Sequence, residues 1–171
     1  QWERQPAVAR ARLDAAAELA GLAGSELASL IQALQPPQLA EGGLAAALRA
    51  EAERWAEQTG IALQLRIDPL PAALPAATEQ ALFRIAQEAL ANVAKHSGAD
   101  TVAVALRAEG DAALLAVRDN GTRGAARERP GGLGLPSMRE RAAAAGGSLT
   151  VERGVAGTSV VCRVPLSEVR R

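Results

Sequence analysis

The sequence is poor in the residues that form disulfides, metal sites and aromatic cores. Its 171 residues include one cysteine, one phenylalanine, two tryptophans and no tyrosine, and aromatic residues make up 2%. Cys162 has no partner for an intrachain disulfide, and the single histidine, His96, adds no cluster of metal ligands. The core must therefore be built from leucine, valine, isoleucine and alanine, which favours close packing of helices on a sheet.

The sequence has no excess of positive or negative charge. The formal net charge at pH 7 is +0, so no electrostatic argument supports binding to nucleic acid. There is no signal peptide and no apolar run long enough to span a bilayer. We therefore expect this segment to be cytoplasmic and to make no membrane contact, an expectation compatible with a full-length parent anchored in the inner membrane.

Residues 1–35 are helical in composition. Leucine, isoleucine and alanine recur at helical spacing from Ala7 to Leu34, and Pro36-Pro37 ends the pattern. So long an apolar stripe needs another helix to cover it. Two interpretations stay open, namely a helix packed on its own domain and a helical pair or dimer seam.

The rest of the chain mixes helical and strand patterns. Helices are predicted at Leu44–Thr59, Ala76–Ser97 and Pro136–Ala145, and strands at Ile61–Ile67, Thr101–Arg107, Ala113–Arg118, Ser148–Arg153 and Thr158–Val164. Helices separate the strand pairs without alternating with them one for one. This order predicts an α+β fold, a two-layer sandwich with helices on one face of a mixed, largely antiparallel sheet, preceded by a long helix.

The predicted helix that ends at Ser97 has two faces. An apolar stripe follows helical spacing through Leu82, Ile85, Ala86, Ala89 and Val93. Glu88, Asn92 and Lys95 lie together on another side, and His96 lies between the two. On this helix alone, a solvated polar face is the more common explanation. The motifs that follow it favour a functional site.

Four segments, in order, resemble the boxes of GHKL-type (Bergerat-fold) ATP-binding domains. The run RIAQEALANVAKHSGA resembles the N box, and Asp119-Asn120-Gly121 the G1 box. Gly132-Leu133-Gly134-Leu135 resembles the G2 box, and Gly157-Thr158-Ser159-Val160 the final strand. LQPPQL, N-x-x-K-H and GLGLPSMRERAAAAGG resemble, more narrowly, the sensor histidine kinases that pair with LuxR/NarL-type response regulators.

This resemblance implies a domain organisation and a reaction. Residues 1–37 would be the remnant of a dimerisation and phosphotransfer hairpin, mostly its second helix, and residues 38–171 the catalytic ATP-binding domain. The domain would transfer the γ-phosphoryl group of ATP to a histidine outside this chain, because His96 is the only histidine and belongs to the N box. A homodimeric parent and a LuxR/NarL-type response regulator are the partners implied.

The N-box side chains suit phosphoryl transfer. Mg²⁺ prefers oxygen ligands and is usually bound by only one or two protein groups, so the Asn92 amide oxygen could be its single protein ligand. Glu88 could orient or deprotonate the nucleophile near the γ-phosphate. Lys95 supplies a point charge for phosphate. For His96, a contact with phosphate or ribose and a simple helix cap stay equally open.

The remaining boxes suit recognition of the base and the phosphates. Asp119 ends a strand beside Gly121, where its carboxylate can accept from an exocyclic amine, and the resemblance implies that this amine belongs to adenine. Thr158 would support the same contact through water. The run from Gly132 and Leu133 through Gly134 and Leu135 would let backbone N–H groups approach phosphate at a helix N-terminus.

One box departs from the family pattern. The expected D-x-G-x-G spacing is lengthened, because Thr122-Arg123 stand between Gly121 and Gly124. Two other functions stay open: a GHKL kinase of the anti-sigma-factor type, and a non-catalytic nucleotide-binding or dimerisation module. The LQPPQL connector and the long apolar helix favour the sensor kinase over the first of these.

Overall fold

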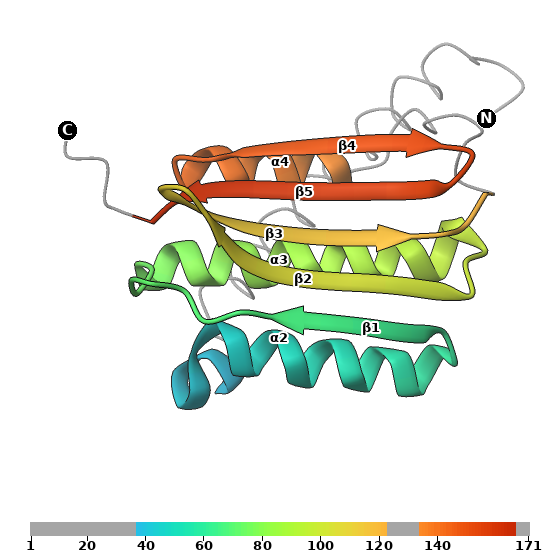
Figure 1. The fold of residues 1–171 in the computed structure, drawn as a ribbon, viewed down its shortest axis with the longest axis horizontal. Coiled ribbons are helices and arrows are strands. Elements are labelled where there is room, and N and C mark those ends of the chain that lie inside the picture. The colour runs from blue at the N-terminus through green and yellow to red at the C-terminus, as the bar shows by residue number, and fades with distance from the viewer. Residues whose placement is uncertain (1–36, 123–133, 167–171) are drawn as a thin grey trace, which may run out of the picture. The chain divides into compact units, whose positions relative to one another are not determined.

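Five strands form a single mixed sheet with β3 at its centre (Figure 1). The computed structural model describes residues 37–122 and 134–166. The strand order is β1-β2-β3-β5-β4. The strands are β1 (Ala62–Ile67), β2 (Thr101–Glu109), β3 (Ala112–Asp119), β4 (Ser148–Gly154) and β5 (Gly157–Pro165). β1 is parallel to β2, and the other neighbouring strands are antiparallel.

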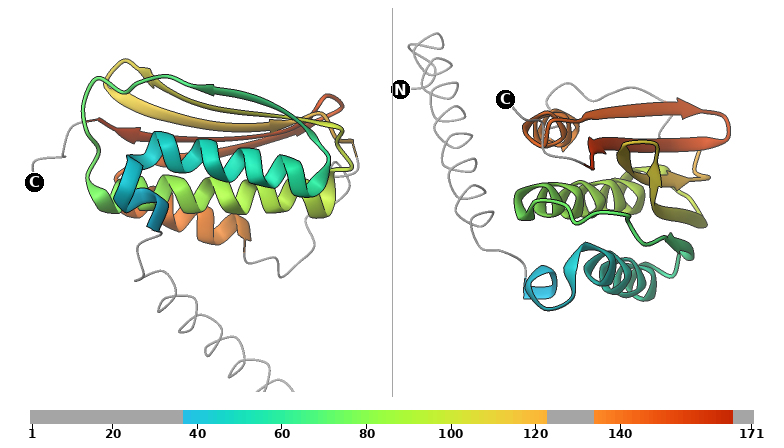
Figure 2. Two further views of the ribbon diagram at one scale, coloured as in Figure 1. Left: turned by 90° about the horizontal axis from the view of Figure 1, so that it is seen from below. Right: turned by 60° about the vertical axis from the view of Figure 1, so that its left-hand side comes forward.

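Three helices cover one face of this sheet (Figure 2). They are α2 (Pro37–Thr59), α3 (Ala76–Asn92) and α4 (Gly134–Ala144), and a π-helical turn, η1 (Val93–Ser97), continues α3. α3 lies between α2 and α4 and contacts both. The predicted α+β sandwich, with helices on one face of a largely antiparallel sheet, is therefore confirmed.

The core lies between the helices and the sheet and contains almost no aromatic side chains. Along β2, buried and partly exposed residues alternate, as expected for a strand with one covered face. The predicted inner face of α2 is buried at every position, namely Leu44, Ala47, Leu48, Ala52 and Trp55. The apolar stripe of α3 is buried as well, together with Phe83. Alanines on these faces let helix and sheet backbones approach closely.

All three helices differ from the prediction at a boundary, and α4 begins at Gly134, two residues before the expected Pro136. α2 begins at Pro37, upstream of the expected Leu44, and is interrupted at Gly43, whose φ of 68° and ψ of −178° are not helical. α3 does not continue as a regular α-helix to Ser97 but changes to π-helical geometry at Val93. Gly98, with a φ of 64°, then ends the helix in the left-handed region that glycine tolerates.

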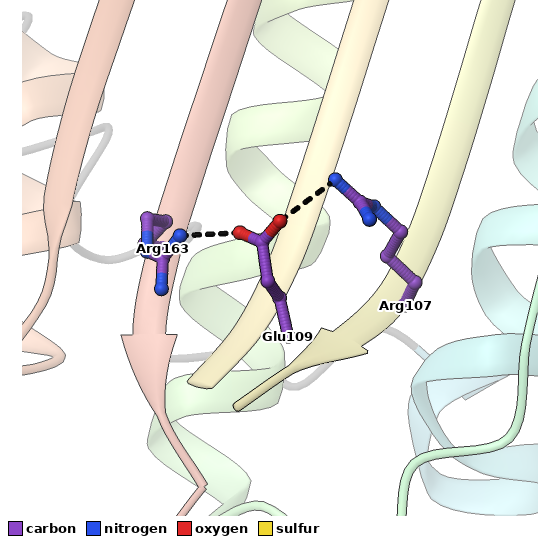
Figure 3. A network of polar contacts seen from close by, with 3 residues as sticks. All are labelled: Arg107, Glu109 and Arg163. Atoms are coloured by element: carbon purple, nitrogen blue, oxygen red, sulfur yellow. Dashed lines mark hydrogen bonds and ion pairs between the residues drawn. The ribbon is translucent and has the colours of Figure 1, made fainter. Parts of the chain in front are cut away.

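The other face of the sheet carries a polar network (Figure 3). Glu109 accepts from Nη2 of Arg107 at 3.1 Å and from Nη1 of Arg163, so one carboxylate links β2 to β5 across β3. Beneath these side chains, Leu114 is only 5% exposed although no described helix covers this face. The long arginine side chains therefore shield apolar surface that would otherwise face water.

The predicted hairpin remnant lies outside the described residues, except for Pro37, and the predicted loop after Asp119 is described only as far as Thr122. Within residues 37–122 and 134–166, no helix has both the length and the apolar character required to cross a membrane.

Candidate functional site

Asp119 is the last residue of the central strand and is only 9% exposed. Its neighbours in the sheet are Val102 on β2 and Thr158 on β5. Oδ1 accepts a hydrogen bond from the backbone N–H of Gly121 at 2.8 Å. Oδ2 makes no hydrogen bond with a described residue. The carboxylate is therefore held in one orientation and keeps one oxygen for a ligand.

Two glycines allow the backbone to pack tightly around this carboxylate. A Cβ atom at Gly157 would lie 1.7 Å from the carbonyl oxygen of Asp119. A Cβ atom at Gly121 would lie 2.3 Å from the carbonyl oxygen of Ser97, at the end of η1. In both places the obstacle is backbone, which cannot move aside easily. Glycine at these positions is therefore required for the close approach of β5 and of the turn after β3.

The residue between Asp119 and Gly121 has a structural role that the sequence analysis missed. Oδ1 of Asn120 accepts from the backbone N–H groups of Asp100 and Thr101, at 3.2 and 3.1 Å. Its Nδ2 donates to Oδ1 of Asp100 at 2.6 Å, and this bond is the main reason why the pKa of the Asp100 carboxyl lies below its ordinary value. An asparagine directly after a strand is a usual sign of such side-chain-to-backbone bonding.

Ser97 also has a structural role that the sequence did not reveal, beyond its place at the end of a helix. It is buried, its Oγ donates to the carbonyl of Val93 at 2.8 Å, and the same oxygen accepts from the N–H of Ala99 at 3.0 Å. These bonds fix the end of η1, against which Gly121 packs. A serine close to a helix end could have indicated this cap, because its hydroxyl group can bond to the nearby backbone.

The polar side chains of the N box lie at the C-terminal end of α3 and on η1. Glu88 and Asn92 are one helical turn apart and partly exposed. Lys95 and His96 are exposed and make no hydrogen bond or ion pair with another described residue. Of the two roles open for His96, a helix cap would require a hydrogen bond to the backbone, and the side chain of His96 makes none within the described residues. π-Helical turns are frequent at functional sites, and this one carries Lys95 and the single histidine of the chain.

The start of α4 lies against Glu88. A Cβ atom at Gly134 would lie 2.2 Å from Oε1 of Glu88, so the first residue of α4 contacts the N-box carboxylate directly. Leu135 is partly buried and packs against the hydrophobic core. Gly132 and Leu133, the other predicted residues of this box, lie outside the described residues.

Two arginines lie near Glu88, between α3 and α4. Burial, followed by repulsion from Arg84, lowers the pKa of Arg141 from its ordinary value, while Glu88 and Glu140 oppose this shift. Nη1 of Arg84 donates to Gln87 at 3.0 Å, and its buried Nε has no hydrogen-bond partner within the described ranges. Two arginine and two glutamate side chains thus interact electrostatically between α3 and α4.

The described site residues form one continuous line. It runs from the start of β5 to the end of β3, through the following turn to η1, and then along α3 to the start of α4. A cavity of about 310 Å³ lies elsewhere, lined by residues of the α2 interruption, the β1–α3 connection, Glu79 and Leu106. It shares no residue with this line.

The described residues contain no group of three or more histidine, cysteine, aspartate or glutamate side chains that could enclose a metal ion. Asn92 is partly exposed and its amide oxygen makes no hydrogen bond with a described residue. This arrangement suits a hard divalent cation held by one protein oxygen and by the phosphates of its substrate.

Comparison with known proteins gives a family match over this part of the chain. The family described as "Histidine kinase-, DNA gyrase B-, and HSP90-like ATPase" matches residues 77–168, from α3 past the end of β5. All four boxes identified in the sequence lie within the matched range.

Curated relatives match over most of the chain. The sensor histidine kinase MctS of Rhizobium johnstonii is 36% identical over 163 residues, which cover 92% of this chain and 35% of that protein. The sensor histidine kinase NarS of Mycobacterium tuberculosis is 34% identical over 156 residues, covering 86% of this chain and 36% of that protein. The chain therefore spans about a third of the length of these relatives.

Solved structures share the fold. A blue-light activated histidine kinase of Erythrobacter litoralis superposes with a TM-score of 0.61 at 24% identity, covering 74% of this chain and 43% of that chain. The mycobacterial sensor histidine kinase MprB gives a TM-score of 0.56 at 22% identity, covering 70% of this chain and 93% of that chain.

Proposed function

Because this chain belongs to the family of histidine kinase-, DNA gyrase B- and HSP90-like ATPases, we propose that its line of polar residues binds Mg²⁺·ATP, whose γ-phosphoryl group is then transferred to a protein histidine. The chain carries the ATP-binding catalytic domain of a two-component sensor kinase. The acceptor histidine would lie elsewhere in the parent protein. A homodimeric parent and a LuxR/NarL-type response regulator complete the proposal.

The Asp119 carboxylate is the single observation that carries this proposal. It is buried, its Oδ1 is held by the N–H of Gly121 at 2.8 Å, and its Oδ2 is left to accept from a ligand. This oxygen can be reached by a ligand, and a hydrogen bond from a donor to a nearly buried carboxylate is favourable. The exocyclic amine of adenine is such a donor, and Thr158, the partner of Asp119 on β5, can support it through water.

At the other end of the line, Asn92 would hold Mg²⁺ through its amide oxygen. When bound, the ion neutralises charge on the phosphates during transfer. Lys95 and His96 project from η1 without partners in the described part of the chain, so they are available to the phosphates. Glu88, one turn before Asn92, would orient the attacking histidine or take up its proton.

Calorimetric titration of Asp119→Asn tests the base site. Asparagine retains an oxygen that can accept from Gly121, so the turn is preserved, but its amide replaces Oδ2 by a donor facing the adenine amine. We expect ATP and ADP affinity to fall by about 1–3 kcal/mol, the cost of a mispaired buried group. Ser159→Ala, at the residue after Thr158 on β5, is the control and should bind both nucleotides with normal affinity. Unchanged affinity in Asp119→Asn would overturn the base site.

Incubation with γ-labelled ATP tests the transfer. The chain alone should acquire no acid-labile label, because His96 is its only histidine and belongs to the nucleotide site. Addition of the parent's complete dimerisation hairpin should give labelled hairpin. Glu88→Ala should retain nucleotide binding and lose this transfer. Label on the chain alone would contradict the proposed acceptor, and tight binding without transfer would favour a non-catalytic module.

A further inference from the structure

The Glu88 side chain occupies the space beside Gly134 where any other residue would carry its Cβ atom. That atom would lie 2.2 Å from Oε1, 3.1 Å from Cδ and 3.5 Å from Cγ of Glu88. A distance of 2.2 Å is far shorter than a non-bonded contact between carbon and oxygen. A side chain at position 134 would therefore require the Glu88 carboxylate to move.

Position 134 differs from Gly121, Gly147 and Gly157, where a Cβ atom would also be crowded. At Gly121, Gly147 and Gly157, the nearest obstacle to a Cβ atom is a backbone carbonyl, and Gly157 also has a positive φ of 119°. At Gly134 every obstacle belongs to the flexible end of one side chain, and the residue lies in a helix. Gly134 is not among the glycines with a positive φ, so its backbone conformation does not itself require glycine.

We propose that Gly134 is a positioning residue, whose lack of a side chain leaves the Glu88 carboxylate room at the start of α4. The proposal rests on the proposed function, because that function gives Glu88 its part in transfer. The first turn of a helix presents free N–H groups and the positive end of the helix dipole, both of which favour a carboxylate. An alanine at 134 would fold normally but would displace the carboxylate from this place.

The melting temperature tests the contact independently of activity. In a Glu88→Ala background the obstacle is absent, so Gly134→Ala should change the melting temperature little, because position 134 is the first residue of α4 and not in its interior. With Glu88 present, the same change should lower the melting temperature, because the carboxylate must leave its place. An equal change in both backgrounds would overturn the proposed contact.

Gly154→Ala is the matched control for this comparison. A Cβ atom at Gly154 would meet nothing within 4 Å, and its φ is not positive. Its effect on melting should therefore be the same in both backgrounds. A different effect would mean that Glu88→Ala perturbs the whole domain, and the contact would then lose its support.

Phosphoryl transfer to a supplied hairpin tests the positioning role. Gly134→Ala should slow transfer at saturating ATP by about a hundredfold, as misplacement of a reacting group by an ångström can do. In a Glu88→Asp background, the shorter side chain withdraws from position 134, so Gly134→Ala should slow transfer far less. An equal cost in both backgrounds would overturn the positioning role. Absence of ATP binding or transfer in the unmodified chain would overturn the proposed function, while the melting comparison would still decide the contact.

Discussion

The backbone carbonyl of Asp119 fills the space that a side chain at Gly157 would need. Gly157 opens β5 with a φ of 119°, and its Cβ position lies 1.7 Å from that oxygen. Because Asp119 pairs with Thr158 in the sheet, this contact determines how closely the two strand ends meet beneath the carboxylate. The final glycine-threonine box thus shapes the proposed base site through its backbone.

Gly157→Ala should therefore destabilise the fold and weaken nucleotide binding together. A positive φ and a backbone collision cost about 1–3 kcal/mol for a residue other than glycine. The strand ends must also separate, which moves Thr158 away from Asp119. Thermal unfolding and ADP calorimetry measure the two effects, with Gly154→Ala as a control that meets no neighbour. Full affinity in Gly157→Ala would show that the strand contact does not shape the site.

Asn92→Ala should remove the magnesium dependence of ATP binding. The amide oxygen of Asn92 is the proposed protein ligand of Mg²⁺, whereas ADP without metal would be held by the proposed base site and by Lys95. Titrations of ATP with Mg²⁺ and of ADP with a chelator, on both proteins, separate these contributions. Equal losses under the two conditions would mean that Asn92 supports the helix end and not the ion.

Asn120→Ala should raise the pKa of Asp100 toward its ordinary value of 3.8. The hydrogen bond from Asn120 is the largest cause of the lowered pKa, and that from Thr101 is the second. Because the folded-state pKa lies below the unfolded one, the stabilisation is complete above pH 3.8 and is lost as the pH falls through the folded value.

Carboxyl NMR titration checks this order of causes. Thr101→Val should give a smaller rise in the Asp100 pKa than Asn120→Ala, since it removes only the weaker bond, which has a length of 2.9 Å. A larger rise in Thr101→Val would contradict the role of Asn120 as the main partner.

The Cys162 thiol should be inert in the folded protein. It is fully buried, and burial raises its pKa to about 11, so the reactive thiolate is scarce at neutral pH. A disulfide reagent at pH 8 should modify it only after denaturant is added. Val155→Cys is the matched control, because Val155 is 96% exposed and a thiol there should react at once. Immediate reaction of Cys162 would contradict the core packing.

The strands and the buried helix faces could be predicted because their periods are regular. Alternation along β2 and the helical stripe of α3 each depend on local spacing, and the structure places those residues in the core. The resemblance of the four boxes to a known family also named Asp119 and Thr158, which the sheet then sets side by side.

The remaining features depend on contacts between distant residues. The π-helical turn was not predicted, because it follows from packing and from the Ser97 bond to Val93, while the composition of the segment suits an ordinary helix. The contact of Gly134 with Glu88 joins two boxes that no local pattern connects. A glycine in a glycine-rich loop has too many explanations for sequence alone to choose this one.

The central position of β3 divides the site into two parts with different dynamics. Asp119 belongs to a strand that is hydrogen-bonded on both sides, so its amides should exchange with solvent only when the whole domain opens. Lys95 and His96 have exposed side chains on η1, whose backbone is anchored by the buried Val93 and Ser97. The part that would select the base is thus fixed before any ligand arrives, while the two exposed side chains that would meet the phosphates can adjust by rotation.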